Sequence, residues 1–280
     1  MISPEVGSSC TAFGDTVNRC ELRGISKEEE GSSMITVACG VRDRLDHLRE
    51  SLPTWLACKE VSQVLLVDWS SREPLALPDD VRVDLVRVEG QTRWHHSKCH
   101  NQEVELAGCE RILRLDADHV LSPSFFTRHY LEEGELFRYA ITPSSDENEK
   151  HLAGAVYARR DDFLRVGGYN ERLVHYGYED EDLVRRLVAS GLRARDLDPA
   201  FMRHIPHGDD ARLAGQDVPA DLGARPPWAP WSWRPGRAVD DLADRNKHLA
   251  AGQPWSIHEK KSQWLLSATG PRSYTCREVA

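Results

Sequence analysis

The stretch Arg111-Ile-Leu-Arg-Leu-Asp-Ala-Asp-His119 contains the pattern that decides the fold. Its apolar residues predict a short buried strand, and two carboxylates, Asp116 and Asp118, follow that strand directly. In an open α/β sheet, ligands gather at the carboxyl ends of the strands, so these acids should face a crevice. A D-x-D pair there suits a divalent cation with oxygen ligands and open positions for phosphate oxygens. Taken alone, the pair is also compatible with two acids that close a strand and solvate a turn.

The composition of the 280-residue chain is that of an ordinary globular protein, with 40% hydrophobic and 29% charged residues. A net charge of -9 argues against nucleic-acid binding, because neutralising phosphates requires a basic face. No apolar run approaches the roughly 20 residues of a membrane span. The seven cysteines form no C-x-x-C pair and the N-terminus does not resemble a signal peptide, so we expect a reduced, cytoplasmic protein.

Strands and helices alternate along the chain, which predicts βαβ units and a mostly parallel central sheet flanked by helices. Besides the strand at 111–115, strands are expected at 34–39, 64–67, 81–88, 139–142 and 153–158. The alternation of apolar and polar residues in 81–88 is typical of an edge or half-buried strand. Helices are expected after Asp43, which can cap the first one before a kink or restart at Pro53, and also at 100–108, at 123–130, after Asp161 and from Glu179.

We divide the chain into three parts. Residues 1–32 lack periodicity and are expected to form a flexible leader. Residues 33–212 carry the alternating strands and helices of a single α/β domain. Residues 213–280 are expected to form a C-terminal arm or lid, because the stretch 226–235 is too rich in proline for a core element.

A second acidic site is predicted in Tyr176-Gly-Tyr-Glu-Asp-Glu-Asp182. Acids at a helix start complement the helix dipole and cap free N–H groups, which accounts for one or two of the four. A carboxylate such as Asp180 or Glu179 can also serve as a general base for a hydroxyl nucleophile. The two tyrosines add flat surfaces with hydroxyl tips, which suits a sugar.

Two histidines, His204 and His207, follow in the segment Phe201-Met-Arg-His-Ile-Pro-His207. A neutral imidazole can complete a mixed oxygen and nitrogen metal shell begun by Asp118, and a solvated loop is the alternative. A further histidine and cysteine cluster does not have the spacing of a structural zinc site; its members are His95, His96, Cys99, His100 and Cys109.

In this order, the segments resemble the inverting glycosyltransferases of the GT-A (Rossmann-like) fold, above all the β-1,4-galactosyltransferase family and the chondroitin-polymerase-type transferases. The residues 40–48 resemble the R-N-R turn of that family, and Lys98-Cys-His-Asn101 resembles its K-x-x-N segment. The residues 154–170 match a spaced G, F, G-[FY]-[ND] pattern, and 176–182 is similar to W-G-W-G-G-E-D-x-D. Two departures are the tyrosines in place of tryptophans without the glycine pair, and the lack of a clear counterpart of the methionine ligand.

The resemblance implies a metal-dependent transferase that moves a galactose-, N-acetylgalactosamine- or glucose-type sugar from a UDP-sugar to an acceptor hydroxyl. The donor half would be about 33–120 and the acceptor half about 121–212. Asp118 with His204 or His207 would hold Mn²⁺ or Mg²⁺, Asp180 would be the base, and Glu179 would orient hydroxyls. Donor contacts would come from a wider set, namely Arg42, Arg44, Asp68, Lys98, Asp116 and Gly154. For Asp68, a turn role at the end of its strand is the alternative.

Two other classes of protein are compatible with this pattern. A sugar-nucleotide-forming nucleotidyltransferase shares the layered design and the metal, but it usually carries a glycine-rich basic loop where this chain has Gly40-Val-Arg-Asp-Arg44. A non-catalytic carbohydrate-binding protein on the same fold would be expected to lose the acids that this chain keeps. The acceptor is a saccharide, a peptide or a small molecule, and the pattern does not choose among them.

Overall fold

A computed structural model describes residues 11–12, 34–76, 78–216, 218–229, 236–259 and 261–279. The leader predicted at residues 1–32 lies outside these ranges except for Thr11 and Ala12, which pair with a strand near the C-terminus. Within the described residues, no helix is long and apolar enough to cross a membrane.

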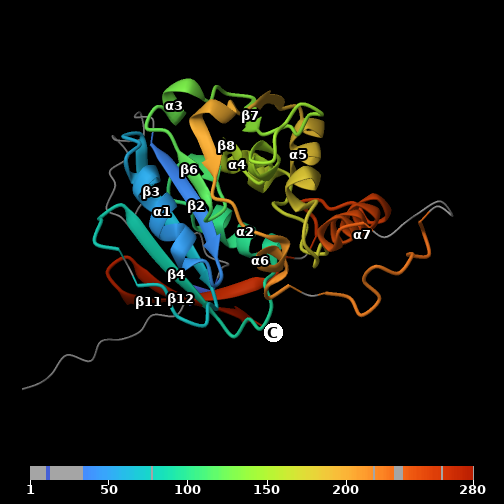
Figure 1. Cartoon of the computed structure of the whole chain (residues 1–280). Helices are drawn as coiled ribbons and strands as arrows, with labels where there is room; N and C mark the ends of the chain where they lie inside the picture. Colours follow the sequence, from blue (N-terminus) through green and yellow to red (C-terminus); the bar gives the residue numbers. More distant parts are fainter. Residues whose placement is uncertain are drawn as a thin grey trace, which may run out of the picture.

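The described strands form one large mixed sheet and one small sheet (Figure 1). The order across the large sheet is β1-β11-β12-β4-β3-β2-β5-β8-β7-β9. Its strands are β1 Thr11–Ala12, β2 Ile35–Val41, β3 Val61–Trp69, β4 Val83–Glu89, β5 Arg111–Arg114, β7 Glu135–Arg138, β8 Val156–Arg159, β9 Arg193–Asp196, β11 Gln263–Gly270 and β12 Ser273–Val279. The central strands β12, β4, β3, β2 and β5 are all parallel to their neighbours in this run, which confirms the predicted α/β class. The small sheet pairs β6 His119–Leu121 with β10 Met202–His204.

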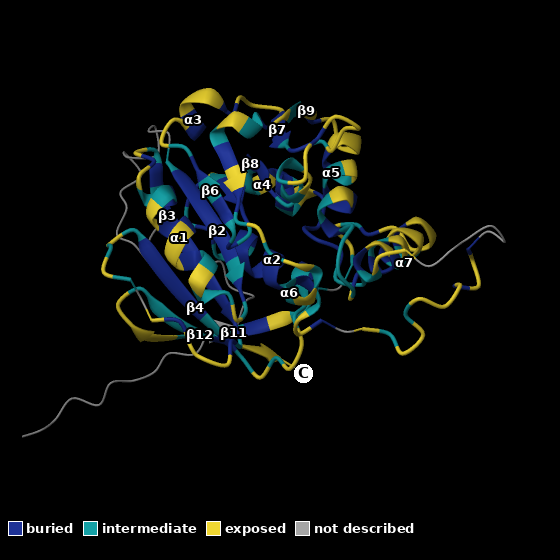
Figure 2. Ribbon diagram, viewed as in Figure 1, coloured by how far each residue is buried: buried dark blue, intermediate teal, exposed yellow. Residues whose placement is uncertain are grey.

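Helices cover both faces of the large sheet. The described helices are α1 Leu45–Leu56, α2 His96–Leu106, α3 Phe125–Arg128, α4 Arg160–Arg165, α5 Glu179–Ala189, α6 Asp209–Leu213 and α7 Ala238–Gly252, with 3-10 turns at Glu149–Leu152 and Pro199–Phe201. Strand β3 shows why its sequence is almost continuously apolar: Val64 and Leu66 pack in one core with α1, whereas Leu65 and Val67 pack in the other with α2 and α5. A parallel strand buried on both faces needs apolar side chains at consecutive positions. Figure 2 shows these strands buried along their length.

The structure corrects several local predictions. Asp43 does not cap α1, because its carboxylate accepts hydrogen bonds from Arg72 instead. Helix α1 contains Pro53 within one continuous element, so it does not restart there. The strand expected at 139–142 lies instead at Glu135–Arg138, directly before that range. The strand expected to be an edge or half-buried strand, β4, is interior and mostly buried.

The C-terminal region supplies part of the sheet, which its sequence did not predict. Strand β12 pairs in parallel with β4, and β11 pairs with β12 in an antiparallel hairpin. Their residues 263–279 belong to the stretch that was expected to be an arm or lid. Six of the ten residues of the proline-rich segment within that stretch, 230–235, lie outside the described ranges. The described Trp228 stacks on His248 of α7, with ring centroids 4.5 Å apart.

Candidate active site

The strand order places a crevice between β2 and β5. The chain moves from β2 outward to β3 and β4 on one side, then returns to β5 on the other side of β2. At such a switch point, the loops after two neighbouring parallel strands diverge and leave room for a ligand. Arg42 follows β2 and Asp116 follows β5, and both line a cavity of about 680 Å³. The segment 138–154, the turn 176–181 and α6 close its other sides.

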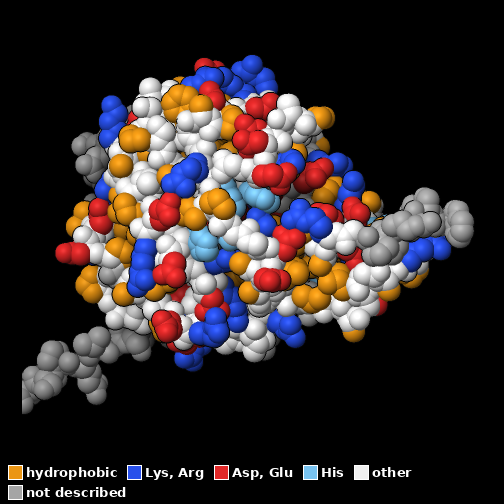
Figure 3. Space-filling model, in the orientation of Figure 1, with side chains coloured by type: hydrophobic (Ala, Val, Ile, Leu, Met, Phe, Trp, Pro, Cys, Tyr) orange, Lys and Arg blue, Asp and Glu red, His pale blue; other side chains and the backbone are white. Residues whose placement is uncertain are grey.

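The small sheet brings the two predicted histidines to Asp118. His204 pairs in register with His119, and the backbone N–H of Ile205 donates to the carbonyl oxygen of Asp118 at 2.7 Å. His207 Nε2 then lies 2.6 Å from Asp118 Oδ2, and His204 Nε2 lies 3.7 Å from the same oxygen. In Figure 3, histidine side chains gather at the centre of the face, among acidic and basic groups.

These three side chains could hold a divalent cation. One ligand atom from each lies within 4.8 Å of the others. Asp118 Oδ1 is buried and has no hydrogen-bond partner among the described residues, which leaves a lone pair available for a metal. Burial alone would raise the pKa of Asp118, but hydrogen bonds from His204 and His207 outweigh it and hold that pKa well below the usual range. The carboxylate is therefore ionised, as a metal ligand must be.

A buried arginine joins the D-x-D segment to the second acidic site. Arg114 Nη2 donates to Asp116 Oδ1 at 2.6 Å, and Arg114 Nη1 lies 3.4 Å from Asp180 Oδ1. Nη1 also donates to the carbonyl oxygen of Gly154 at 2.6 Å. A Cβ atom on Gly154 would lie 2.6 Å from Asp116 Oδ2, so only glycine leaves this carboxylate in place. Arg114 was not among the predicted site residues, because an arginine inside a strand carries no spacing signal.

Burial raises the pKa of both candidate catalytic carboxyls at the start of α5. It raises the pKa of Glu179 to about 8, helped by the charge of Asp180. It raises the pKa of Asp180 to about 6, against the opposing effect of Arg114. Desolvation is the largest of the effects on the pKa of Asp180. At neutral pH, Glu179 can donate a hydrogen bond while Asp180 is mostly ionised, so the two neighbours have different roles available.

The turn before α5 presents both predicted tyrosines to the cavity. Gly177 and Tyr178 both have positive φ, at 86° and 75°. A left-handed tyrosine is strained, and such strain is kept where the surroundings enforce it. Here Asn246 of α7 donates to the carbonyl oxygens of His175 and Gly177, at 2.8 and 2.7 Å. The C-terminal region thus shapes the side of the cavity formed by Tyr176 and Tyr178.

The predicted donor contacts divide into two groups. Arg42, Arg44, Asp116 and Gly154 line the cavity. The guanidinium of Arg42 donates to backbone carbonyls of Trp69, Gln91 and Thr92, which fixes the loops at the mouth. Arg44 donates to the carbonyl oxygen of Ala211 in α6.

Asp68 and Lys98, which were also predicted to contact the donor, do not line this cavity. The Asp68 carboxylate is buried, accepts from the backbone N–H groups of Ser71 and Leu75, and pairs with Arg87 at 2.5 Å. It therefore has the alternative turn role. Lys98 points elsewhere and pairs with Glu278 on β12 at 2.5 Å. Asp68 is held by hydrogen bonds from the loop after β3, and Lys98 by its ion pair with β12, so neither group faces the D-x-D segment.

Two other residues that line the cavity, Arg212 and His151, were not predicted from the sequence. Arg212 of α6 is buried, pairs with Asp209 at 3.0 Å, and has an Nη2 without a partner among the described residues. His151 lies beside His204, with ring centroids 4.8 Å apart. Both come from segments without a recognisable motif, and only the folded chain brings them to the cavity.

Comparisons with known proteins agree with this architecture. A family profile described as the N-terminal domain of galactosyltransferase matches residues 142–208. The catalytic domain of Drosophila β1,4-galactosyltransferase 7, solved with xylobiose, is 13% identical, with a TM-score of 0.52 over 88% of this chain and 93% of that chain. A mutant of that enzyme, solved with manganese, UDP-Gal and xylobiose, is 12% identical, with a TM-score of 0.53 over 88% and 92%. No curated protein sequence matches this chain. At these identities the structural likeness establishes the fold, so the predicted GT-A fold is confirmed.

Proposed function

We propose that this GT-A-fold protein is a metal-dependent inverting glycosyltransferase that moves a sugar from a UDP-sugar to an acceptor hydroxyl. One observation carries the proposal: a ligand cluster for a cation and a pair of carboxyls with separated pKa values face the same cavity. Arg114 links the two through Asp116 and Asp180. The profile match to a galactosyltransferase domain over 142–208 supports the same class of reaction, since that segment contains Glu179, Asp180 and His204.

Asp118, His204 and His207 would hold the cation, which we propose to be Mn²⁺ or Mg²⁺. When bound, it would neutralise charge on the departing nucleoside diphosphate, as a Lewis acid and template. Arg44 and Arg212 also line the cavity, and their guanidinium groups would bind phosphate oxygens of the donor. The manganese and UDP-Gal in the similar Drosophila structure support this choice of ion and donor.

Asp180 would act as the general base. The acceptor oxygen attacks C1 of the sugar, the bond from C1 to the phosphate oxygen breaks, and the hydroxyl proton passes to the Asp180 carboxylate. Such a single displacement inverts the configuration at C1. With a pKa of about 6, Asp180 is close to the working pH, where a base is most effective. Glu179, protonated at neutral pH, would orient a hydroxyl by donating to it.

A saccharide is the acceptor that the site supports best. Tyr176 and Tyr178 offer aromatic faces with hydroxyl tips at the cavity, which is the chemistry of a sugar platform. The xylobiose in both similar structures supports this choice. A peptide or small-molecule hydroxyl is tested alongside it. We also propose a cytoplasmic location, supported by the buried thiols of Cys39, Cys58, Cys99 and Cys276, which form no disulfide among the described residues.

The test is release of UDP from a panel of UDP-sugars, with Mn²⁺ and with saccharide, peptide and small-molecule acceptors. We expect UDP release that depends on both metal and acceptor, and a product with the inverted anomer by NMR. Release of pyrophosphate from UTP and a sugar phosphate would instead identify a nucleotidyltransferase. Binding of saccharide without turnover of any donor would identify a non-catalytic carbohydrate-binding protein.

A further inference from the structure

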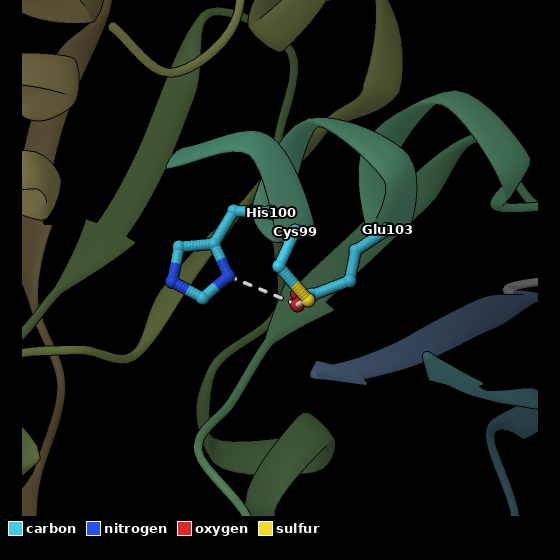
Figure 4. Close-up of side chains that lie close together, drawn as sticks. All are labelled: Cys99, His100 and Glu103. Atoms are coloured by element: carbon cyan, nitrogen blue, oxygen red, sulfur yellow. Dashed lines mark hydrogen bonds and ion pairs between the residues drawn. The ribbon is translucent and has the colours of Figure 1, made fainter. Parts of the chain in front are cut away.

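Helix α2 buries a polar cluster that the proposed reaction does not use directly. Cys99, His100 and Glu103 lie on one face of the helix, and the side chains of His100 and Glu103 are fully buried (Figure 4). His100 Nδ1 lies 2.9 Å from Glu103 Oε1, and Cys99 Sγ lies 3.6 Å from the same oxygen. Burying an imidazole and a carboxylate is costly unless they are hydrogen-bonded. Their mutual hydrogen bond offsets this cost and fixes the two side chains relative to each other.

The cluster contacts the arginine that bridges the two acidic sites. Arg114 Nη2 lies 2.5 Å from His100 Nε2, and Arg114 Nε lies 3.7 Å from Glu103 Oε2. Because a guanidinium has only donors, His100 Nε2 must be the acceptor. The imidazole proton is therefore on Nδ1, where it is donated to Glu103. Glu103 selects this tautomer, and the tautomer in turn fixes Arg114.

His100 also contacts the second group that holds Asp180. Its ring lies against that of Tyr169, with centroids 4.9 Å apart. The Tyr169 hydroxyl donates to Asp180 Oδ1 at 3.1 Å. The next residue of α2, Asn101, exchanges two hydrogen bonds with the backbone of Tyr169, at 2.7 and 3.0 Å. Both hydrogen-bond donors to Asp180 are thus braced by α2.

The end of β2 is shaped to admit this cluster. A Cβ atom on Gly40 would lie 2.5 Å from Cys99 Sγ and 2.6 Å from Glu103 Oε1. Because both side chains are buried, neither could move aside freely. The cluster could be considered for a metal ion, since its ligand atoms lie within 4.8 Å of one another. However, Arg114 already contacts His100 and lies near Glu103. Its guanidinium supplies the positive charge that a metal ion would otherwise bring to this cluster.

We propose that His100, with its tautomer set by Glu103, is a positioning residue that locks Arg114 and Tyr169 against Asp180. This inference rests on the proposed function only for its catalytic consequence, since the geometry it describes can be measured without turnover. If His100 cannot accept from Arg114, the guanidinium is free to leave Asp180. The base would then lose a cation that favours its ionised form.

Five groups facing Asp180 determine how its pKa responds. Burial raises this pKa most, Arg114 and Tyr169 lower it, and the carboxylates Asp116 and Glu103 raise it. The fifth group is the adjacent Glu179, whose own pKa is raised by the charge of Asp180. A displaced Arg114 should raise the pKa of Asp180 by about 1 unit, the lower end of the effect of an adjacent arginine. The ionised fraction would fall about fivefold at pH 6 and about twofold at pH 7 for such a shift.

A matched pair of variants separates positioning from packing. In His100→Gln, the amide oxygen can take the place of Nε2 as acceptor for Arg114; in His100→Asn, the shorter side chain reaches only the Nδ1 position. We would follow the Asp180 carboxyl by NMR on protein labelled at aspartate Cγ, assigned with Asp180→Asn. His100→Asn should raise the pKa of Asp180 by about 1 unit, and His100→Gln should leave it near the wild-type value. The control is Glu135→Gln, which removes a buried β7 carboxylate that pairs with Arg193 and Arg195 of β9 and should leave the pKa of Asp180 unchanged.

Several results would overturn the inference. An unchanged Asp180 titration in a folded His100→Asn variant would show that the cluster only packs the helix. Equal shifts in the Gln and Asn variants would show that the acceptor at Nε2 is irrelevant. If the Asn variant does not fold, nitrogen NMR of wild-type His100 decides: the neutral Nδ1–H form should persist from pH 5 to 8, and an imidazolium in that range would refute the contact. Failure of every donor in the UDP-release assay would refute the proposed function and leave these NMR results standing.

Discussion

Replacement of Asp180 by asparagine tests the central chemical assignment. The substitution keeps the size of the side chain and its contact with the Tyr169 hydroxyl, but it removes the basicity. Turnover should fall by about 10²–10⁴-fold, the usual effect of losing a positioned base. UDP affinity should barely change, because Asp118, His204 and His207 lie elsewhere in the cavity.

The pH dependence follows from the raised pKa of Asp180. With a pKa of about 6, Asp180 is roughly nine-tenths ionised at pH 7 and roughly one-tenth ionised at pH 5. Wild-type activity at saturating metal should therefore fall about tenfold between these two pH values, as the base becomes protonated. The residual activity of Asp180→Asn should lack this step, since no titrating base remains.

The assay is UDP release from pH 5 to 9 at saturating Mn²⁺ and donor. The matched control is Asp182→Asn, because Asp182 stands on the same helix but pairs with Arg186 at 2.7 Å and does not line the cavity. That variant should keep its turnover and its acid step. Near wild-type turnover in Asp180→Asn, or the same acid step in its residual activity, would refute the assignment. If the Asp182→Asn and Glu179→Gln variants also retain turnover, the acids at this helix start are only a cap.

Three further perturbations have defined outcomes. Asp118→Ala should abolish turnover, and EDTA should abolish the activity of the wild type without changing its thermal unfolding. Full activity in EDTA would show that the reaction does not need a metal. Gly154→Ala places a Cβ 2.6 Å from Asp116 Oδ2, so it should lower turnover by up to about 10²-fold with little change in melting temperature, whereas wild-type kinetics would show that the carboxylate can move freely. Burial raises the pKa of Glu179 from 4.5 to about 8, so the folded state favours the protonated carboxyl. The stability that comes from this preference is fully present below pH 4.5 and is lost as the pH rises toward 8. Glu179→Gln should remove that loss and stabilise the protein at pH 7 by up to about 3 kcal/mol in denaturant unfolding, and a destabilised variant would contradict the raised pKa.

Local patterns were sufficient for most of the central fold. The strands β2, β3 and β5 each contain an apolar run, which in β5 is only Ile112 and Leu113. The apolar positions of α1 and α5 recur at helical spacing, because each helix must bury one face. The same signal failed for β11 and β12, whose exposed and half-buried residues form a hairpin at the edge of the sheet. Their place in the sheet depends on pairing with β4, which lies far away in the sequence.

The sequence alone determined which residue types stand at the carboxyl end of β5 and at the start of α5, because each of these sites is contiguous in the chain. Only the tertiary structure decided that His204 and His207 reach Asp118, through the pairing of β6 with β10. It also decided that Asp68 and Lys98 turn away from the cavity, and that Arg114 stands between Asp116 and Asp180. The pKa values of Glu179 and Asp180 depend on burial and on charges brought from other elements. Such quantities are set by distances across the fold, and no spacing along one segment contains them.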